Sequence, residues 1–275
     1  RIGSSAASDV YKRQNKNRPF FLYLAHWGVH TPLQALKSDY DELTYISDHV
    51  ERVYAAMIKS LDRSVGRIVE SLQENGLSEN TWIIFTSDNG GAGYIGLRYI
   101  NSPYRGWKLT LFEGGIRVPL IFWKDGIEQR QLTQRATHID IMPTIHGLVD
   151  NLLEHEVDGI DLFSDQYDLN SRPIFWKTGH NKVVIKDNWK LQVADYPDKK
   201  WLYNLAEDPT EQIELSLEHP EKTTELLALI NQHSDGATET LYKPPLLANI
   251  EIDRTLKEVS EDGPIEDEES VWVTN

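Results

Sequence analysis

The stretch TWIIFTSDNGG, which runs from Thr81 to Gly91, decides how the fold is interpreted. Its first six residues are suited to burial, and they predict a strand over residues 81–87. The strand ends at an acid, Asp88, an amide, Asn89, and two glycines, which let the backbone turn sharply and leave room for a ligand. A buried strand that brings a carboxylate and a carboxamide to its end indicates a candidate binding site.

A long amphipathic helix is expected immediately before this strand. Apolar side chains recur at three- and four-residue steps between Val50 and Leu72, which places them on one helical face. Asp48 and Glu51 have the spacing of an N-terminal capping box. Gly76 fits the position just after a helix, where the backbone often turns left-handed. The sequence therefore predicts one helix between Asp48 and Gly76.

Two more apolar runs are candidate strands. Residues 19–25 (PFFLYLA) are almost wholly apolar, as in strands buried on both faces of a parallel sheet, and residues 118–123 (VPLIFW) form another such run. Strand, helix and strand in succession are the crossover unit of a parallel sheet. A further helix is expected over residues 139–149. The predicted fold is therefore α/β, with a mostly parallel sheet sandwiched by helices.

From about Arg172 the pattern changes to short strands separated by turn residues, which predicts an antiparallel meander. The strand candidates are residues 173–176, 182–186, 189–193 and 201–203. A helix is expected to follow over residues 220–233. Together these elements predict a small C-terminal α+β subdomain that contains an antiparallel sheet.

These patterns divide the chain into four expected parts. They are a foreign or disordered lead (1–17), part of an α/β domain (18–165), the α+β subdomain (166–235) and an acidic tail (236–275). The opening residues have neither an initiating Met nor an apolar signal segment, so the chain is expected to be a fragment.

Composition narrows the functional classes. Of 275 residues, 40% are hydrophobic, enough for a sizeable core. The formal net charge of −15 argues against a nucleic-acid partner, because phosphate contacts need clustered Lys and Arg. The absence of Cys excludes disulfides and thiolate metal sites. No apolar run approaches the roughly 20 residues that a membrane span needs.

Polar side chains at the ends of two candidate strands are the first functional signal. In open α/β sheets, ligands bind outside the carboxyl ends of strands. Asp88 and Asn89 offer the oxygen ligands that suit a hard cation such as Ca²⁺ or Mg²⁺. The alternative is a simple turn, since Asp, Asn and Gly dominate turns. The other strand end carries His26 and His30.

The segment from Asn101 to Pro119 contains sequence blocks that are more specific than the Asp88-Asn89 pair. It contains Arg105-Gly-Trp-Lys108 and then Glu113-Gly-Gly-Ile-Arg-Val-Pro119. It resembles the sulfatase family, whose members carry a DNG strand end followed by R-G-x-K-x-x-x-x-E-G-G-x-R-V-P. Other blocks resemble the family in order and at fitting intervals. They are PFFLYL (19–24), HTPLQ (30–34), THIDIMPT (137–144), DGIDL (158–162), DNWKL (187–191) and LYNLAEDP (202–209).

The resemblance implies an alkaline-phosphatase-like fold, truncated at its N-terminus, and roles for matching residues. Asp88 and Asn89 match two ligands of the family's divalent cation, usually Ca²⁺, with Mg²⁺ as the alternative. Lys108 and His30 match a catalytic lysine and histidine that contact the sulfate. The implied substrate is a sulfated small molecule or glycan, and the implied location is periplasmic or secreted. The oligomeric state stays open.

Other residues of these blocks are assigned no chemistry. His26 is expected to be structural. Glu113 and Arg117 are expected to fix the geometry of the loop that presents Lys108. Arg105 has two interpretations, either orienting that loop or pairing with a carboxylate near the cation.

The family's nucleophile is absent from this chain. Sulfatases use a formylglycine made from Cys or Ser within C/S-x-P-x-R, and the chain contains neither a Cys nor a Ser-x-Pro-x-Arg. The prediction is therefore the C-terminal portion of a sulfatase, itself inactive. Two alternatives stay open: a phosphonate or phosphate monoester hydrolase on the same fold, and a non-catalytic anion-binding homologue.

Overall fold

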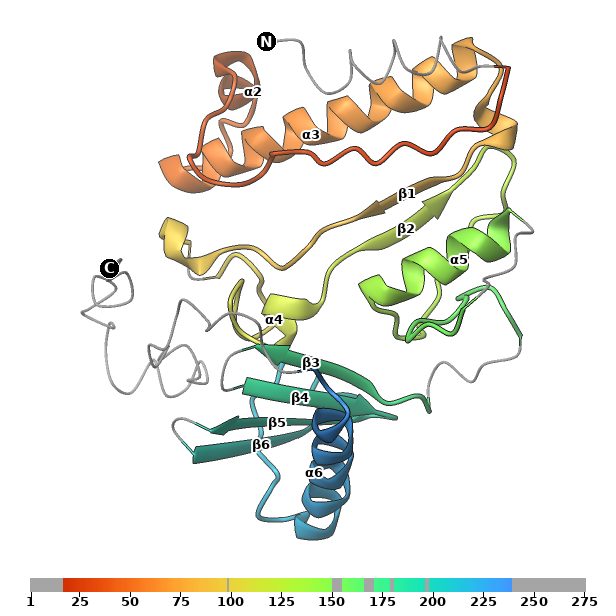
Figure 1. The fold of residues 1–275 in the computed structure, drawn as a ribbon. Helices are drawn as coiled ribbons and strands as arrows, with labels where there is room; N and C mark the ends of the chain where they lie inside the picture. The colour runs from red at the N-terminus through yellow and green to blue at the C-terminus, as the bar shows by residue number, and fades with distance from the viewer. Residues whose placement is uncertain are drawn as a thin grey trace. The chain divides into compact units, whose positions relative to one another are not determined.

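The computed structural model describes most of the chain between residues 17 and 238. The described ranges are 17–97, 99–149, 155–165, 171–178, 181–195 and 198–238. The expected lead before residue 17 and the acidic tail beyond residue 238 lie outside them. Figure 1 shows the elements, which belong to two compact units. The first unit is Arg1–Ile100 with Arg117–Gln129, and the second is Asn101–Ile116 with Arg130–Asn275.

The two units divide the segment between residues 100 and 130. The loop of residues 101–116, which carries Lys108, groups with the C-terminal strands. The strand candidate of residues 118–123 groups with the N-terminal part of the chain. The loop therefore depends on the C-terminal strands for its packing.

The long helix of the first unit confirms its sequence signals. Helix α3 spans His49–Glu74, and the Asp48 side chain accepts a hydrogen bond from the Glu51 backbone N–H at 2.8 Å. Gly76 has a φ of 65°, the left-handed conformation expected just past a helix end. A short helix, α2 (Lys37–Glu42), lies against α3, and Asp39 forms a two-pronged ion pair with Arg63. The helix prediction is therefore correct at both ends.

The strands of the first unit form an antiparallel pair. Strand β1 (Ile83–Thr86) pairs with β2 (Leu120–Trp123), with Ile83 opposite Trp123. Short 3-10 turns lie on either side of β1, at Ser78–Asn80 (η1) and Gly93–Ile95 (η2). The expected mostly parallel sheet does not occur among the described residues, where every paired strand is antiparallel.

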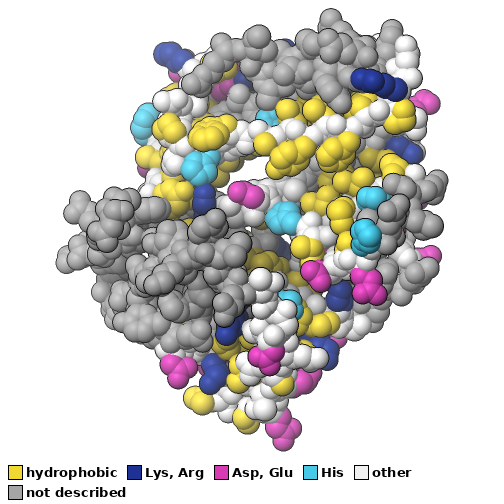
Figure 2. All heavy atoms as spheres, viewed as in Figure 1, with side chains coloured by type: hydrophobic (Ala, Val, Ile, Leu, Met, Phe, Trp, Pro, Cys, Tyr) yellow, Lys and Arg dark blue, Asp and Glu magenta, His cyan; other side chains and the backbone are white. Residues whose placement is uncertain are grey.

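Residues 19–25 were expected to be a buried strand, and in the structure they are not one. The run is extended but joins no ladder, and the Phe21 and Tyr23 side chains are 70% and 81% exposed. Trp27 is similarly exposed, and Figure 2 shows hydrophobic side chains gathered on the surface of this unit. An apolar run becomes a buried strand only where neighbouring strands pair with its backbone. No described strand does so here.

The second unit contains the predicted meander. Its strands pair antiparallel in the order β3-β4-β5-β6. Their bounds are β3 Ile174–Thr178, β4 Asn181–Lys186, β5 Trp189–Asp195 and β6 Asp198–Asn204. The expected helix is α6 (Pro220–Asp235). The α+β prediction for this region is confirmed.

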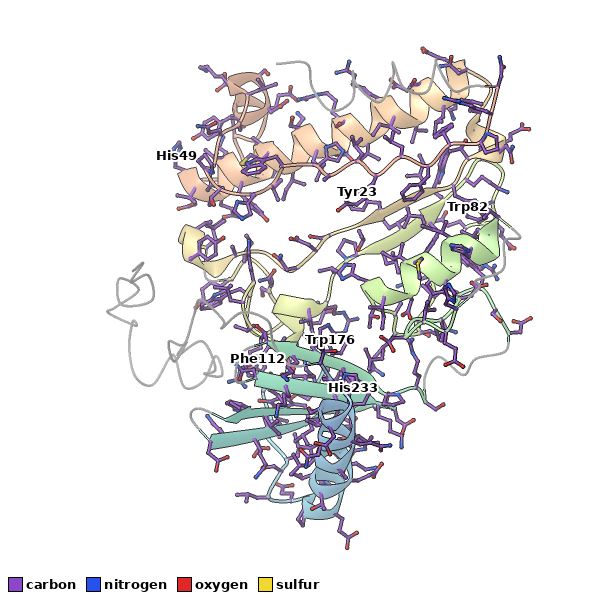
Figure 3. All side chains as sticks on the ribbon, in the orientation of Figure 1. Tyr23, His49, Trp82, Phe112, Trp176 and His233 are labelled. Carbon is purple, nitrogen blue, oxygen red and sulfur yellow. The ribbon has the colours of Figure 1, made fainter. Side chains whose placement is uncertain are left out.

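The meander buries both of its faces, because successive side chains of a strand point to opposite sides. One face packs on α6, where Leu226 and Ile230 contact a cluster that includes Leu191 and Leu202. The other face packs on the loop that carries Lys108. Phe112 of that loop joins a cluster with neighbouring strand residues, near Trp176 in Figure 3. The cluster also contains Val183, Ile185, Trp201 and Tyr203.

The remaining helices of the second unit are short. Helix α4 is Glu113–Ile116, η3 is His138–Asp140 and α5 is Ile141–Leu148, which confirms the helix predicted over residues 139–149. Asp140 is fully buried, and both of its oxygens accept hydrogen bonds from the Arg172 guanidinium at 2.7 Å. It also accepts the Ile160 N–H at 3.0 Å, which ties the DGIDL block to this helix.

In the part of the chain that the structure describes, no helix combines the length and the apolarity that crossing a membrane demands.

Candidate active site

Asp88 and Asn89 lie in the turn after β1, as their position in the sequence predicts. The Asp88 side chain is exposed and Asn89 is half-buried. The Ser87 hydroxyl donates to the Asn89 carbonyl at 2.8 Å, which folds the backbone over the turn. Both residues belong to the first unit.

The chemistry of these two side chains fits a hard cation, but they form only part of a site. Ca²⁺ takes about six to eight oxygen ligands, and Asp88 and Asn89 provide one carboxylate and one amide. Among the residues with described positions, no group of three His, Asp or Glu side chains is placed to hold a metal ion. Any cation held here would need further ligands.

His30 lies in an exposed loop of the same unit. Its Nδ1 donates to the Thr31 carbonyl at 2.9 Å, and the Trp27 ring meets the imidazole edge-on with centroids 6.1 Å apart. Because a carbonyl can only accept, Nδ1 carries a proton. His26 is half-buried, and burial lowers the pKa of its imidazole, which favours the neutral ring of a structural residue.

Lys108 lies at the tip of a tight turn in the second unit. The Thr110 N–H donates to the Trp107 carbonyl at 2.9 Å, so Lys108 and Leu109 occupy the two central positions of a β-turn. The φ of Leu109 is 88°, a value usually left to glycine. A non-glycine residue in the left-handed region costs about 1–3 kcal/mol and persists only where its surroundings hold it.

The glycines of the E-G-G block explain the spacing of the motif. A Cβ on Gly114 would lie 2.3 Å from the Gly106 carbonyl oxygen and 2.5 Å from that of Arg105. A Cβ on Gly115 would lie 2.3 Å from the Thr110 carbonyl oxygen. The chain turns at Lys108 and returns onto these two positions. They are therefore glycine because only a hydrogen atom fits beneath the returning backbone.

A buried cluster of charged residues holds the base of this loop. Lys190 from β5 places its ammonium 3.0 Å from Glu113 and 2.7 Å from Glu211. Lys190 and Glu211 have no exposed surface. Burial alone would lower the pKa of Lys190, but the two carboxylates raise it above its ordinary value. Burial raises the pKa of Glu211.

Arg105 completes the cluster. Its contacts distinguish between the two roles considered for it, orienting the loop and pairing with a carboxylate near the cation. Its guanidinium donates to the Tyr203 hydroxyl at 2.7 Å and to the Glu211 carbonyl at 3.2 Å, and it lies 4.1 Å above the centre of the Phe112 ring. These contacts orient the loop and involve no carboxylate. Glu113 is structural, as predicted, and its ion pair is with Lys190.

Lys190, Glu211 and Tyr203 are the residues of this region that sequence reasoning missed. Lys190 and Tyr203 lie within the DNWKL and LYNLAEDP blocks, and Glu211 follows the second block by two residues. The blocks were recognised, but their contact with the Lys108 loop depends on strand packing.

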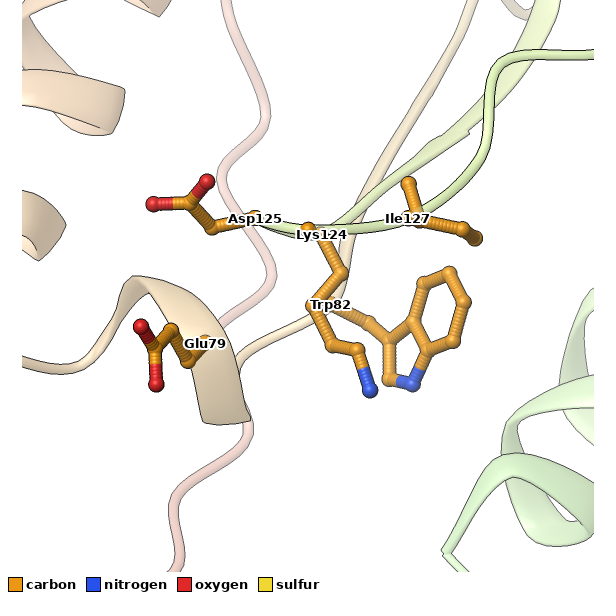
Figure 4. Close-up of a pocket in the computed structure, with 6 residues that line it drawn as sticks. Glu79, Trp82, Lys124, Asp125 and Ile127 are labelled. Carbon is orange, nitrogen blue, oxygen red and sulfur yellow. The ribbon is translucent and has the colours of Figure 1, made fainter.

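A separate hollow lies at the opposite end of β1 from Asp88 (Figure 4). Trp82 forms one wall, and the Lys124 ammonium lies 4.9 Å from the centre of the indole. Its other lining residues are Glu79, Asp125, Gly126 and Ile127. It contains none of the predicted site residues.

The fold is similar to those of several solved structures. The crystal structure of Ps i-CgsB in complex with k-i-k-neocarrahexaose matches with a TM-score of 0.79 and 28% identity, over 87% of this chain and 56% of that one. The PsFucS1 sulfatase from Pseudoalteromonas sp. matches with a TM-score of 0.67 and 22% identity, over 84% of this chain and 51% of that one. The fold is the alkaline-phosphatase-like fold of these solved structures.

The sequence comparisons identify the family. A family model named Sulfatase matches residues 6–151, more than half of the chain. The chain therefore belongs to the sulfatase family. Its relatives include arylsulfatase J of Mus musculus, 27% identical over 86% of this chain and 48% of the relative. A sulfatase of Formosa agariphila is 30% identical over 83% of this chain and 47% of the relative.

A third relative is the N-acetylgalactosamine-6-sulfatase of Homo sapiens, 26% identical over 84% of this chain and 51% of the relative. The chain thus spans about half the length of the curated relatives it matches.

Proposed function

We propose that the full-length natural protein carrying this chain hydrolyses a sulfate ester to an alcohol and inorganic sulfate. The observation that carries the proposal is the position of Lys108. It lies at the tip of a turn that the R-G-x-K and E-G-G blocks build, within a chain of the sulfatase family. A turn held in a costly backbone conformation around one cationic residue favours a functional role for that residue.

The chemistry requires fixed positive charge. Negative charge grows on the bridging and peripheral oxygens of the ester as the S–O bond breaks. The Lys108 ammonium would donate hydrogen bonds to these oxygens and stabilise the transition state more than the ground state. His30 is proposed as a second sulfate-binding residue. Asp88 and Asn89 would hold a divalent cation, Ca²⁺ in our proposal with Mg²⁺ as the alternative, which would supply Lewis-acid stabilisation when bound.

The attacking group has to come from elsewhere in the full-length protein. The family's formylglycine requires a Cys or Ser in C/S-x-P-x-R, which these 275 residues do not contain. The part of the mechanism assigned to this chain is therefore anion binding and charge stabilisation.

A sulfated sugar is the proposed substrate. The name of one relative specifies N-acetylgalactosamine-6-sulfate, and one similar structure was solved with the oligosaccharide k-i-k-neocarrahexaose. A sulfated glycan is therefore favoured over a sulfated small molecule. A periplasmic or secreted location is part of the same proposal.

The test is a paired assay of the full-length protein with 4-nitrophenyl sulfate, phosphate and phenylphosphonate esters in the presence of Ca²⁺. We expect sulfate ester hydrolysis to dominate. Lys108→Ala should lower kcat/KM by about 10²- to 10³-fold, as for loss of one charge-stabilising donor. Lys37→Ala is the matched control, since Lys37 is 86% exposed and its ion pair with Asp41 lies at the surface.

Two results would contradict the proposal. A preference for the phosphate or phosphonate ester would assign the protein to the phosphohydrolase alternative. Binding of inorganic sulfate without hydrolysis of any ester would assign it to the non-catalytic alternative.

A further inference from the structure

We propose that Glu211, supported by Lys190, is a positioning residue that sets the location of the Lys108 ammonium. This inference rests on the proposed function of Lys108 and extends it to residues outside the R-G-x-K and E-G-G blocks. All the contacts that carry it lie within the second unit.

Glu211 binds both ends of the loop that presents Lys108. Its backbone carbonyl accepts a hydrogen bond from the Arg105 guanidinium, at the start of the loop, at 3.2 Å. Its carboxylate accepts the backbone N–H of Glu113, at the end of the loop, at 2.6 Å. A single buried residue thereby fixes the separation between the two ends of the turn.

The loop ends are also bound to each other. The Gly114 N–H donates to the Arg105 carbonyl at 2.7 Å. Before the turn, the Asn101 amide donates to the Gly106 carbonyl at 3.1 Å. Between the ends, Leu109 keeps its left-handed φ of 88°. Such a conformation needs an over-determined frame, and Glu211 closes that frame on the side of the meander.

Lys190 makes this arrangement possible. Glu113 and Glu211 are two buried acids in contact, which repel each other when both are ionised. The Lys190 ammonium lies within 3.0 Å of both carboxylates and attracts each of them. One ammonium thereby bridges two buried acids and offsets their mutual repulsion.

Stability alone does not account for such a cluster. Buried ion pairs often stabilise a fold no more than apolar residues of the same volume do, because the charges lose their hydration. A buried charged network does, however, specify geometry through its directed hydrogen bonds. The residue at the centre of the loop that this network holds is Lys108.

The test is a double-mutant cycle in the full-length protein, between Glu211→Gln and Lys108→Ala. Gln keeps the shape of the side chain but removes its charge. We expect Glu211→Gln to lower kcat/KM for 4-nitrophenyl sulfate by at least about tenfold, since small misplacements of a catalytic group can cost up to about 10²-fold. In the Lys108→Ala background the same change should have less than about a twofold effect.

A second readout does not depend on turnover. The Kd for inorganic sulfate, measured by isothermal titration calorimetry, should show the same pattern of coupling between the two positions. Tyr203→Phe is a milder variant for the case that Glu211→Gln fails to fold, because it removes only the hydroxyl that accepts from Arg105. We expect it to weaken sulfate binding about two- to threefold with Lys108 present, and not at all with Lys108→Ala.

The matched control is Arg172→Met. It breaks another buried ion pair of the same unit, with Asp140, whose other hydrogen bonds come from Thr137 and Ile160. Its effect should be the same in both backgrounds. If Glu211→Gln and Tyr203→Phe also act equally in both, the positioning role is overturned while the proposed function stands. If Lys108→Ala changes neither readout, the proposed function and this inference both fail.

Discussion

The Glu211 carboxylate accepts a hydrogen bond from the backbone N–H of Glu113 at 2.6 Å, so two buried acidic residues lie in direct contact. Lys190 bridges them, with its ammonium 2.7 Å from Glu211 and 3.0 Å from Glu113. This contact joins the E-G-G block to a segment almost a hundred residues away, and it connects the Lys108 turn to the C-terminal meander.

The first prediction concerns the cation of this cluster. Lys190→Met keeps the volume of the side chain but leaves two buried acids without their bridging ammonium. We expect a loss of about 3–5 kcal/mol in the free energy of unfolding, measured with urea, because removing one partner of a buried pair leaves uncompensated charge. Lys37→Met, at an exposed lysine, should change it by less than about 0.5 kcal/mol. A loss below about 1 kcal/mol for Lys190→Met would show that the cluster is not tightly buried.

The second prediction compares two glycines. A methyl group at Gly114 would meet the carbonyl oxygens of Gly106 and Arg105 at 2.3 and 2.5 Å, and these backbone atoms cannot rotate away. Gly114→Ala should therefore destabilise the fold by more than about 2 kcal/mol. Gly66 lies inside α3 with nothing within 4 Å of its added Cβ, so Gly66→Ala should stabilise by up to about 1 kcal/mol. Thermal unfolding of both variants is the measurement, and effects of the same sign would contradict the described loop.

The third prediction concerns pH. Burial alone would raise the pKa of Asp140, but hydrogen bonds from Arg172, Thr137 and Ile160 hold that pKa below its ordinary value. A carboxyl whose pKa is lower in the folded than in the unfolded state stabilises the fold fully above its unfolded pKa, near 3.8. This stabilisation is lost as the pH falls through the folded pKa.

The free energy of unfolding should therefore fall between about pH 5 and pH 2, and Asp140→Asn should flatten that part of the curve. Chemical unfolding of both proteins across this range measures the difference. Parallel curves for the two proteins would show that Asp140 is not paired as described.

The fourth prediction concerns the 275-residue chain assayed by itself. It carries neither Cys nor Ser-x-Pro-x-Arg, so it lacks the precursor of the family's nucleophile. Loss of a nucleophile commonly costs many orders of magnitude in rate. We expect no hydrolysis of 4-nitrophenyl sulfate with Ca²⁺ above a Lys108→Ala control. Steady turnover that depends on Lys108 would mean that the attacking group lies within these residues.

Local signals predicted much of the fold. Helix α3 was predicted with its Asp48 cap and Gly76 end, because capping and helical periodicity depend on neighbouring residues. The meander of β3 to β6 was predicted for a similar reason, since short strands alternate with turn residues. Sequence blocks also predicted that the Lys108 segment is a loop fixed by Glu113.

Non-local pairing was not predictable in the same way. An apolar run such as residues 19–25 predicts a strand, but a strand forms only where another strand pairs with its backbone. The antiparallel pairing of β1 with β2 depends on strands separated by more than thirty residues. The Lys190–Glu211 cluster was missed because a lone lysine or glutamate is normally a surface residue, and only the packing of the meander buries both.

The central proposal is that the Lys108 ammonium binds the sulfate group of the ester, and that Asp88 and Asn89 hold a divalent cation. The most direct measurement is a crystal structure of the full-length protein with Ca²⁺ and selenate, a sulfate analogue located by its anomalous scattering. We predict one selenate that has an oxygen about 2.7–2.9 Å from the Lys108 Nζ. A Ca²⁺ should lie about 2.3–2.6 Å from the Asp88 and Asn89 oxygens. Selenate bound away from Lys108, or Ca²⁺ bound without Asp88 and Asn89, would contradict the account.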